Sequence, residues 1–157
     1  MAMQIDLIAV GTKIPEWVDT AWKDYIKRLP KDWQLNLIEI TAGKRGKNAP
    51  IARILQDEGE KVLKAATNCD LIIALDRLGK PISSENLAHS CSGWLENNQR
   101  IAILVGGPEG LSEACLTEAT VRWSLSAMTL PHPIVRVVIA EQIFRAWSIL
   151  NKHPYHR

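Results

Sequence analysis

Short apolar runs alternate along this chain with longer segments in which apolar residues recur every three or four positions. The short runs predict five strands, at residues 4–10, 35–40, 70–75, 101–105 and 121–125. The longer segments predict helices at residues 15–28, 50–63, 84–97, 111–120 and 134–150. This alternation is typical of an α/β fold, in which helices cover both faces of a mostly parallel sheet. We expect one domain over residues 1–157.

The run Ile101–Val105 is apolar throughout and is followed at once by Gly-Gly-Pro-Glu-Gly. A short apolar run without polar alternation predicts a strand that is buried on both faces. In open α/β sheets, ligands bind beyond the carboxyl ends of the strands. Gly106 and Gly107 would allow the backbone to approach a ligand closely. A tight strand-to-helix turn that binds nothing is the alternative.

Three loops follow predicted strands and should therefore meet at one edge of a parallel sheet. They are Leu75–Asp76, Gly106–Gly107 and Ser126–Pro131. Together they suit an adenosine-like ligand, because backbone groups can pair with the adenine edge while Leu75, Met128 and Leu130 enclose the ring. The alternative is three ordinary surface loops.

Composition and charge narrow the class of protein. The 157 residues are 46% hydrophobic and 23% charged, which is ordinary for a globular protein, and the formal net charge of +2 is too small to indicate a partner. Cys69, Cys91 and Cys115 stand far apart and form no Cys-x-x-Cys pair, so we expect free thiols and no metal site. The beginning of the chain does not resemble a signal peptide, and no apolar run approaches the ~20 residues of a membrane span. We therefore expect a cytoplasmic protein without a membrane segment.

Several separate motifs resemble one known family, and they occur in the family's order. They are Val-Gly-Thr-Lys at 10–13, Ala-Gly-Lys-Arg-Gly-Lys-Asn at 42–48, Leu-Asp-Arg-Leu-Gly-Lys-Pro at 75–81, Gly-Gly-Pro-Glu-Gly at 106–110, Ser-Leu-Ser-Ala-Met-Thr-Leu-Pro-His-Pro at 124–133 and His-Pro-Tyr-His-Arg at 153–157. The chain resembles the SPOUT methyltransferase superfamily and, within it, the RlmH family of pseudouridine methyltransferases of the large ribosomal subunit RNA. The similarity covers essentially the whole chain.

The resemblance implies a C-terminal deep trefoil knot, S-adenosylmethionine bound in that knot, and a homodimer. It implies that the product is N3-methylpseudouridine in helix 69 of 23S rRNA, formed on the assembled ribosome. Carried over residue by residue, the cofactor site would consist of Leu75, Gly106, Gly107, Ser126, Ala127, Met128, Thr129, Leu130 and Pro131.

Methylation of an imide nitrogen requires a group that removes its proton or stabilises the anion, and it requires no metal. His132, between two prolines, has a side chain suited to proton transfer, although it could instead stiffen the start of the last helix. Glu141 is a second candidate base. Its alternative role is an intrahelical salt bridge with Arg145, for which we expect a structural or interface role.

The basic loop and the tail supply candidate RNA contacts. Lys44, Arg45 and Lys47 lie in a glycine-containing loop without an acidic residue, and they predict phosphate contacts or else a solvated basic loop. In the tail, Tyr155 could stack on the target base, and His156 and Arg157 could hold phosphates or the imide oxygens. A frayed terminus is the alternative. A dimer could bring this tail over the partner's cofactor pocket.

Two other functions remain open from the sequence. A ribosome-binding assembly factor would use the same basic loop without chemistry, but it would not need a nucleoside pocket. A methyltransferase of the same fold could act on tRNA, but the chain has no added RNA-binding domain.

Overall fold

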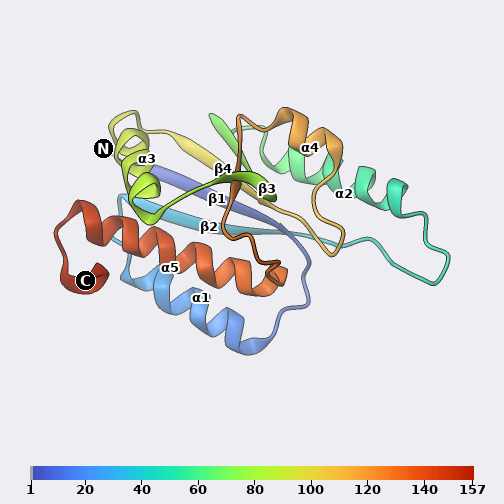
Figure 1. The fold of residues 1–157 in the computed structure, drawn as a ribbon, viewed down its shortest axis with the longest axis horizontal. Coiled ribbons are helices and arrows are strands. Elements are labelled where there is room, and N and C mark those ends of the chain that lie inside the picture. The colour runs from blue at the N-terminus through green and yellow to red at the C-terminus, as the bar shows by residue number, and fades with distance from the viewer. Residues whose placement is uncertain (1) are drawn as a thin grey trace.

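The computed structural model describes residues 2–157 and contains one five-stranded sheet (Figure 1). The strands are β1 (Met3–Val10), β2 (Trp33–Ile40), β3 (Leu71–Pro81), β4 (Arg100–Val105) and β5 (Val121–Ser124). Their order in the sheet is β2-β1-β4-β3-β5, and every neighbouring pair is parallel. The predicted parallel α/β sheet is therefore confirmed.

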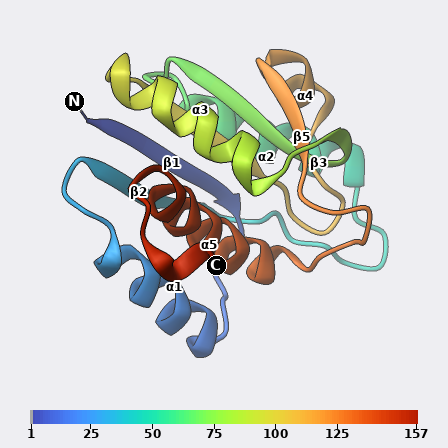
Figure 2. The ribbon, with the colours of Figure 1, turned by 60° about the vertical axis from the view of Figure 1, so that its left-hand side comes forward.

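Helices cover both faces of this sheet, as predicted (Figure 2). They are α1 (Glu16–Arg28), α2 (Ile51–Ala65), α3 (Ser84–Glu96), α4 (Glu113–Glu118) and α5 (His132–Leu150), followed by the 3-10 turn η1 (Pro154–His156). Helix α5 packs between α1 and α3 on one face, whereas α2 and α4 pack together on the other.

Two apolar cores follow from this layering, because successive side chains of a strand point to opposite faces. Leu7 and Ile103 belong to the core beneath α1, α3 and α5, where Trp94 and Ile139 also pack. The adjacent strand residues, Ile8 and Leu104 among them, belong to the core beneath α2 and α4. The central strands are buried on both sides, which explains their unbroken apolar runs.

Strand β3 is longer than predicted and ends at Pro81 rather than Leu75. Its pairing with β5 shifts register between Leu75 and Lys80, so the intervening residues bulge out of the ladder. The polar residues of this bulge interrupt the apolar pattern, which is why the sequence predicts an end at Leu75.

Helix α5 begins at His132, two residues before the predicted start at Ile134. Pro131 is its N-cap and Pro133 lies in its first turn, where a proline has no hydrogen bond to lose. The trefoil knot stays a prediction. Within residues 2–157, no helix combines the length and the apolar character needed to cross a bilayer.

Candidate functional site

The three predicted loops close around one cavity of about 600 Å³. It lies beyond the ends of β4 and β5 and beside the bulge of β3, as the prediction from parallel strands requires. Eight of the nine predicted cofactor residues line it, and the exception is Ala127. The eight are Leu75, Gly106, Gly107, Ser126, Met128, Thr129, Leu130 and Pro131.

The lining of this cavity is mostly apolar and includes a few charged residues. The apolar lining includes Val105, Leu111, Leu116, Leu125 and Val135. Asp76, Arg77 and Glu109 also line the cavity and bring charged groups to it. A concave site of this size, mostly apolar with a few polar groups, is typical of small-molecule and cofactor binding.

The glycine turn on one wall depends on a close approach of two backbone segments. Gly107 and Gly110 form a backbone bridge, in which the Gly110 N–H donates to the Gly107 carbonyl at 3.0 Å. A Cβ on Gly106 would overlap the carbonyl group of Gly110 and would lie 2.7 Å from the backbone nitrogen of Leu111. A Cβ on Gly107 would meet only the side chain of Val10, at 3.2 Å, and that of Arg45, at 3.5 Å. Gly106 is therefore the position that the turn requires.

Two serines give the opposite wall its shape. The Ser124 hydroxyl donates to the carbonyl oxygen of Ser126 at 3.0 Å. The Ser126 hydroxyl oxygen accepts from the backbone N–H of Met128 at 2.9 Å. Ser126 therefore fixes the path of the loop with its side chain.

His132 lines the cavity at the N-terminus of α5. Its Nδ1 is buried and has no hydrogen-bond partner among residues 2–157, and its ring lies so close to Gly11 that a Cβ there would be 3.2 Å from Cε1. Burial, together with the positive charge of Arg136, lowers the pKa of His132 below its usual value. The imidazole is therefore neutral at pH 7.

Arg136 is a structural residue that the sequence analysis missed. It is 1% exposed, although it carries a charge on an otherwise apolar helix. Its guanidinium donates to the carbonyl oxygen of Gly11 at 2.7 Å and to the carboxylate of Glu39 at 2.9 Å. Arg136 therefore ties α5 to the carboxyl ends of β1 and β2. The charge within the apolar helix was the one signal that could have identified it.

Arg45 is bound within the protein, which changes the interpretation of the basic loop. Its guanidinium donates to both carboxylate oxygens of Glu58, at 2.8 and 3.0 Å, and to Glu109 at 2.7 Å. Glu58 is buried on α2 and also accepts the backbone N–H of Gly43 at 2.7 Å. Hydrogen bonding to Glu58 is the largest cause that raises the pKa of Arg45. Both acidic partners lie outside the loop, so the loop's own sequence gives no sign of them.

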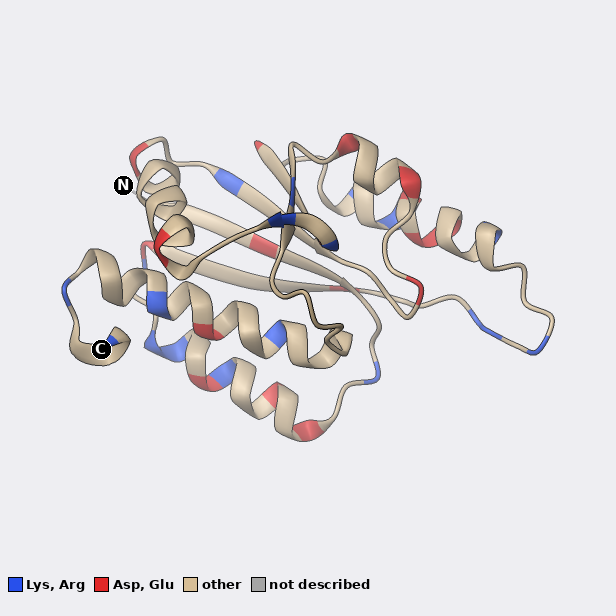
Figure 3. Cartoon of the chain, in the orientation of Figure 1, with Lys and Arg blue, Asp and Glu red and all other residues tan. Residues whose placement is uncertain are grey.

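Lys44 and Lys47, by contrast, are exposed on the same loop. In Figure 3 this basic loop extends away from the body of the protein, beyond α2. Because Glu109 also lines the cavity, Arg45 connects the loop directly to the glycine turn. The structure thus places two exposed lysines on a loop that Arg45 anchors, and neither has an ion pair within residues 2–157.

Glu141 lies outside the cavity and is paired with Arg145, at 2.9 Å. The guanidinium of Arg145 in turn lies over the ring of Tyr155, 5.2 Å from its centroid. The structure thus contains the intrahelical salt bridge that was the alternative role of Glu141, and a role of Glu141 as a base stays a prediction. Glu141 is about 14 Å along α5 from His132, at about 1.5 Å per residue, so the two candidate bases do not share one site.

The tail is packed against the protein rather than frayed. The ring of Tyr155 meets that of Phe144 edge to face at 4.6 Å, and its hydroxyl lies 3.4 Å from that of Tyr25. Ser148 contacts His156 through its hydroxyl, with 2.7 Å between Oγ and Nδ1. Ser148 is about 24 Å along α5 from His132. Within one chain, the tail and the cavity therefore lie at opposite ends of α5 (Figure 1).

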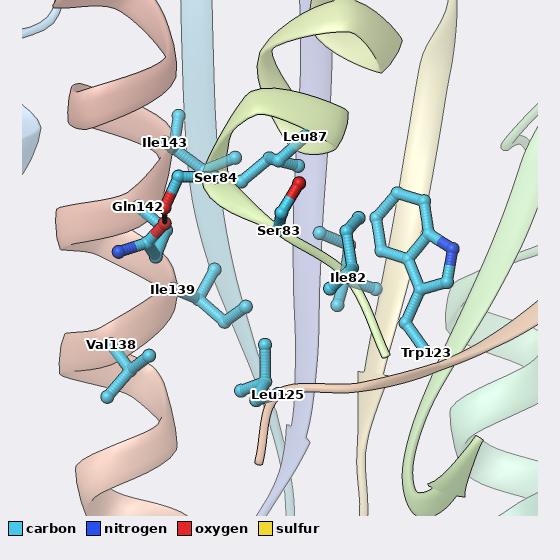
Figure 4. Close-up of a pocket in the computed structure, with 11 residues that line it drawn as sticks. Ile82, Ser83, Ser84, Leu87, Trp123, Leu125, Val138, Ile139, Gln142 and Ile143 are labelled. Carbon is cyan, nitrogen blue, oxygen red and sulfur yellow. Dashed lines mark hydrogen bonds between the residues drawn. The ribbon is translucent and has the colours of Figure 1, made fainter. Parts of the chain in front are cut away.

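A second, smaller cavity of about 180 Å³ lies between α3 and α5 (Figure 4). It is lined by apolar side chains such as Leu87, Trp123 and Ile139, and it shares Leu125 with the larger cavity. At its mouth the Ser84 hydroxyl donates to Gln142 at 2.6 Å.

Comparison with known proteins gives the same assignment as the motifs. A family described as predicted SPOUT methyltransferase matches residues 3–156. A probable methylase family protein from Haemophilus influenzae Rd KW20 has the same fold, with a TM-score of 0.57 and 14% identity over 99% of this chain and 70% of that one. A probable methyltransferase from Bordetella pertussis Tohama I is similar with a TM-score of 0.57 and 18% identity, over 92% of this chain and 96% of that one. The protein whose sequence is described here belongs to the SPOUT methyltransferases, in the RlmH family.

Proposed function

We propose that this protein uses S-adenosylmethionine to methylate N3 of a pseudouridine in helix 69 of 23S rRNA on the assembled ribosome. The observation that carries the proposal is the single cavity formed by the three loops, which the motifs assign to the cofactor. The acceptor is inferred from the RlmH motifs, which extend over the whole chain.

The cavity suits the cofactor in size and in chemistry. Apolar side chains such as Leu75 and Leu130 can enclose an adenine ring, while the close backbone turn at Gly106 can present peptide groups to its polar edge. When bound, S-adenosylmethionine supplies a methyl group activated on a sulfonium. The protein's task is to position the acceptor nitrogen in line with that methyl group, which by itself lowers the barrier substantially.

The imide nitrogen of pseudouridine is protonated at neutral pH, so the site must provide a group that removes this proton or stabilises the resulting anion. His132 is neutral and lies on the cavity wall, and His156 belongs to the tail. Glu141 is already engaged by Arg145. Among these three side chains, the two imidazoles are therefore the ones left to act as the base.

We propose a homodimer in which the tail of one subunit completes the cavity of the other. The position of the tail supports this arrangement, because Tyr155, His156 and Arg157 lie at the far end of α5 from their own cavity. A two-fold related copy would present the same tail to the opposite cavity, so each dimer would contain two equivalent sites.

Lys44 and Lys47 are the proposed phosphate contacts beside each site. Both are exposed, and Arg45 fixes the loop that carries them. With a net charge of only +2, this chain offers RNA a local basic surface rather than a general one. We infer that the assembled ribosome supplies most of the recognition surface.

Transfer of a labelled methyl group tests this function. Intact ribosomes, isolated large subunits and naked rRNA from cells that lack the modification serve as acceptors, and mass spectrometry identifies the product nucleoside. Label on pseudouridine with intact ribosomes alone is the expected result. Ribosome binding without label on any acceptor would instead indicate an assembly factor, and label on tRNA would indicate a different substrate.

A further inference from the structure

Ser148 is buried within α5 and its hydroxyl binds the tail at three points. Its side chain is 0% exposed. The hydroxyl lies 3.0 Å from the carbonyl oxygen of His153, 3.2 Å from the backbone nitrogen of His156 and 2.7 Å from Nδ1 of the same histidine. Within residues 2–157, Ser148 is the hydrogen-bond partner of this ring nitrogen.

A count of protons determines the direction of these hydrogen bonds. A serine hydroxyl has one hydrogen to donate, and a carbonyl oxygen can only accept. The Ser148 hydrogen therefore points to His153, which leaves the lone pairs of Oγ for the backbone N–H and Nδ1 of His156. If the hydroxyl instead donated to Nδ1, no hydrogen would lie between Oγ and the carbonyl oxygen of His153 at 3.0 Å, and that carbonyl would lose its donor.

The network is therefore satisfied only when Nδ1 of His156 carries a hydrogen. In a neutral imidazole, the nitrogen opposite the protonated one carries a free lone pair. Nε2 of His156 thus becomes an acceptor, and it has no hydrogen-bond partner within the described part of the chain, residues 2–157.

The same contacts hold the ring in place. Lys152 adopts a left-handed backbone conformation with φ of 54°, which turns the chain back over α5. The His153 N–H then donates to the backbone carbonyl of Ser148 at 2.9 Å, and Tyr155 packs on Phe144. His156 is therefore held both by the hydroxyl of Ser148 and by the docked chain that precedes it. A fixed position is what an effective catalytic base requires.

We propose that Ser148 is a positioning residue that holds His156 in its Nδ1–H tautomer, so that Nε2 accepts the imide proton of the target pseudouridine. This inference rests on the proposed function and on the tail reaching the partner's cavity. The N3–H bond breaks as an N–H bond forms on Nε2. The electron pair left on N3 attacks the methyl carbon, and the carbon–sulfur bond breaks with its electrons going to sulfur. The imidazolium then releases its proton to water.

The neighbouring groups are less suited to this step. Burial, together with the hydrogen bond between its hydroxyl and that of Tyr25, raises the pKa of Tyr155 to about 12, so the phenol stays protonated and is no base for this step. Nδ1 of His132 is buried against Gly11 and not fixed by any hydrogen bond within residues 2–157. Of His132 and His156, only His156 has a ring nitrogen that hydrogen bonds within residues 2–157 hold in place.

The tautomer can be measured directly on the full chain without substrate. Nitrogen-15 spectra of the histidine rings at about pH 8, above the ordinary histidine pKa, distinguish protonated from unprotonated ring nitrogens. We expect a protonated Nδ1 and a free Nε2 for His156, identified by the loss of its signals in His156→Asn. In Ser148→Ala the preference for this tautomer should be lost. A free Nδ1 in the unaltered protein would overturn the proposal.

Kinetics on ribosomes test the proton-accepting role. His156→Asn retains a donor at the position of Nδ1 and thus the contact with Ser148, but it has no group equivalent to Nε2. We expect kcat to fall about 10²-fold or more with KM for ribosomes within about twofold, as for loss of a general base. Retention of kcat within about threefold would refute the role of His156. If the unaltered protein methylates no acceptor, the proposed function itself fails, whatever tautomer the spectra show.

Discussion

Replacing Arg45 with methionine distinguishes an anchor of the basic loop from an RNA contact. Methionine keeps much of the length of the side chain and removes the guanidinium. Glu58, whose side chain is 4% exposed, would then lose two hydrogen bonds of 2.8 and 3.0 Å and its positive partner. Breaking a buried ion pair on one side costs about 3–5 kcal/mol.

Glu58 keeps one hydrogen bond in this variant, from the backbone N–H of Gly43. The free energy of unfolding should therefore fall by about 3 kcal/mol, the lower limit of that range. For a chain of this length, this lowers Tm by about 6–12 °C. Thermal and urea unfolding measure it. Arg45→Met combined with Glu58→Gln should be more stable than the sum of the two single losses predicts, because the second change removes the unpaired charge.

Lys44→Met is the matched control, since Lys44 is exposed on the same loop. It should leave Tm within about 1 °C of the unaltered protein, as is usual for surface substitutions. If Arg45→Met left Tm equally unchanged and only weakened ribosome binding, Arg45 would be a phosphate contact, as the sequence pattern first indicated, and the anchoring role would be refuted.

Three further results are expected. Gly106→Ala should weaken the binding of S-adenosylhomocysteine at least tenfold, because the new Cβ displaces the Gly110 backbone. Gly107→Ala should change this affinity less than about threefold. Equal losses of affinity in calorimetric titrations of the two variants would contradict this expectation. The double variant Lys44→Met, Lys47→Met should weaken ribosome binding and reduce the salt dependence of that binding, while its affinity for the cofactor stays unchanged. A loss of cofactor affinity would instead show that the loop shapes the cavity. The Tyr155 phenol should ionise near pH 12 instead of 10.0. The stabilisation from the docked tail is therefore complete below pH 10 and is lost as the pH rises to about 12. In an absorbance titration compared with Tyr155→Phe, a midpoint near 10 for Tyr155 would indicate an undocked tail.

The sheet and the cavity could be predicted from the sequence because both depend on local patterns. Unbroken apolar runs such as Ile101–Val105 identify buried parallel strands, and parallel strands bring the loops that follow them to one edge. The order of strands in the sheet could not be predicted, because it depends on pairings between distant residues. The extension of β3 to Pro81 was missed because a bulge hides the strand pattern.

Residues whose role depends on distant partners were the ones that sequence reasoning misread or missed. Arg45 looked like a free cation, since its partners Glu58 and Glu109 are 13 and 64 residues away. Arg136 reaches Glu39, 97 residues earlier in the chain. Ser148 carries no motif, and its role follows only from the return of the tail over α5. These contacts are set by tertiary packing, which local patterns do not encode.

The most direct test of the account combines two inactive variants in one dimer. Gly106→Arg should disrupt the cavity wall, because a Cβ there overlaps the Gly110 backbone, and should leave the tail intact, whereas His156→Asn should leave the cavity intact and remove the base. In a mixed dimer purified through two different tags, one of the two sites contains an intact cavity and its partner's intact tail. We predict that this dimer regains about half of the methyl-transfer rate of the unaltered dimer. A rate no higher than that of the two inactive variants alone would contradict a site shared between subunits.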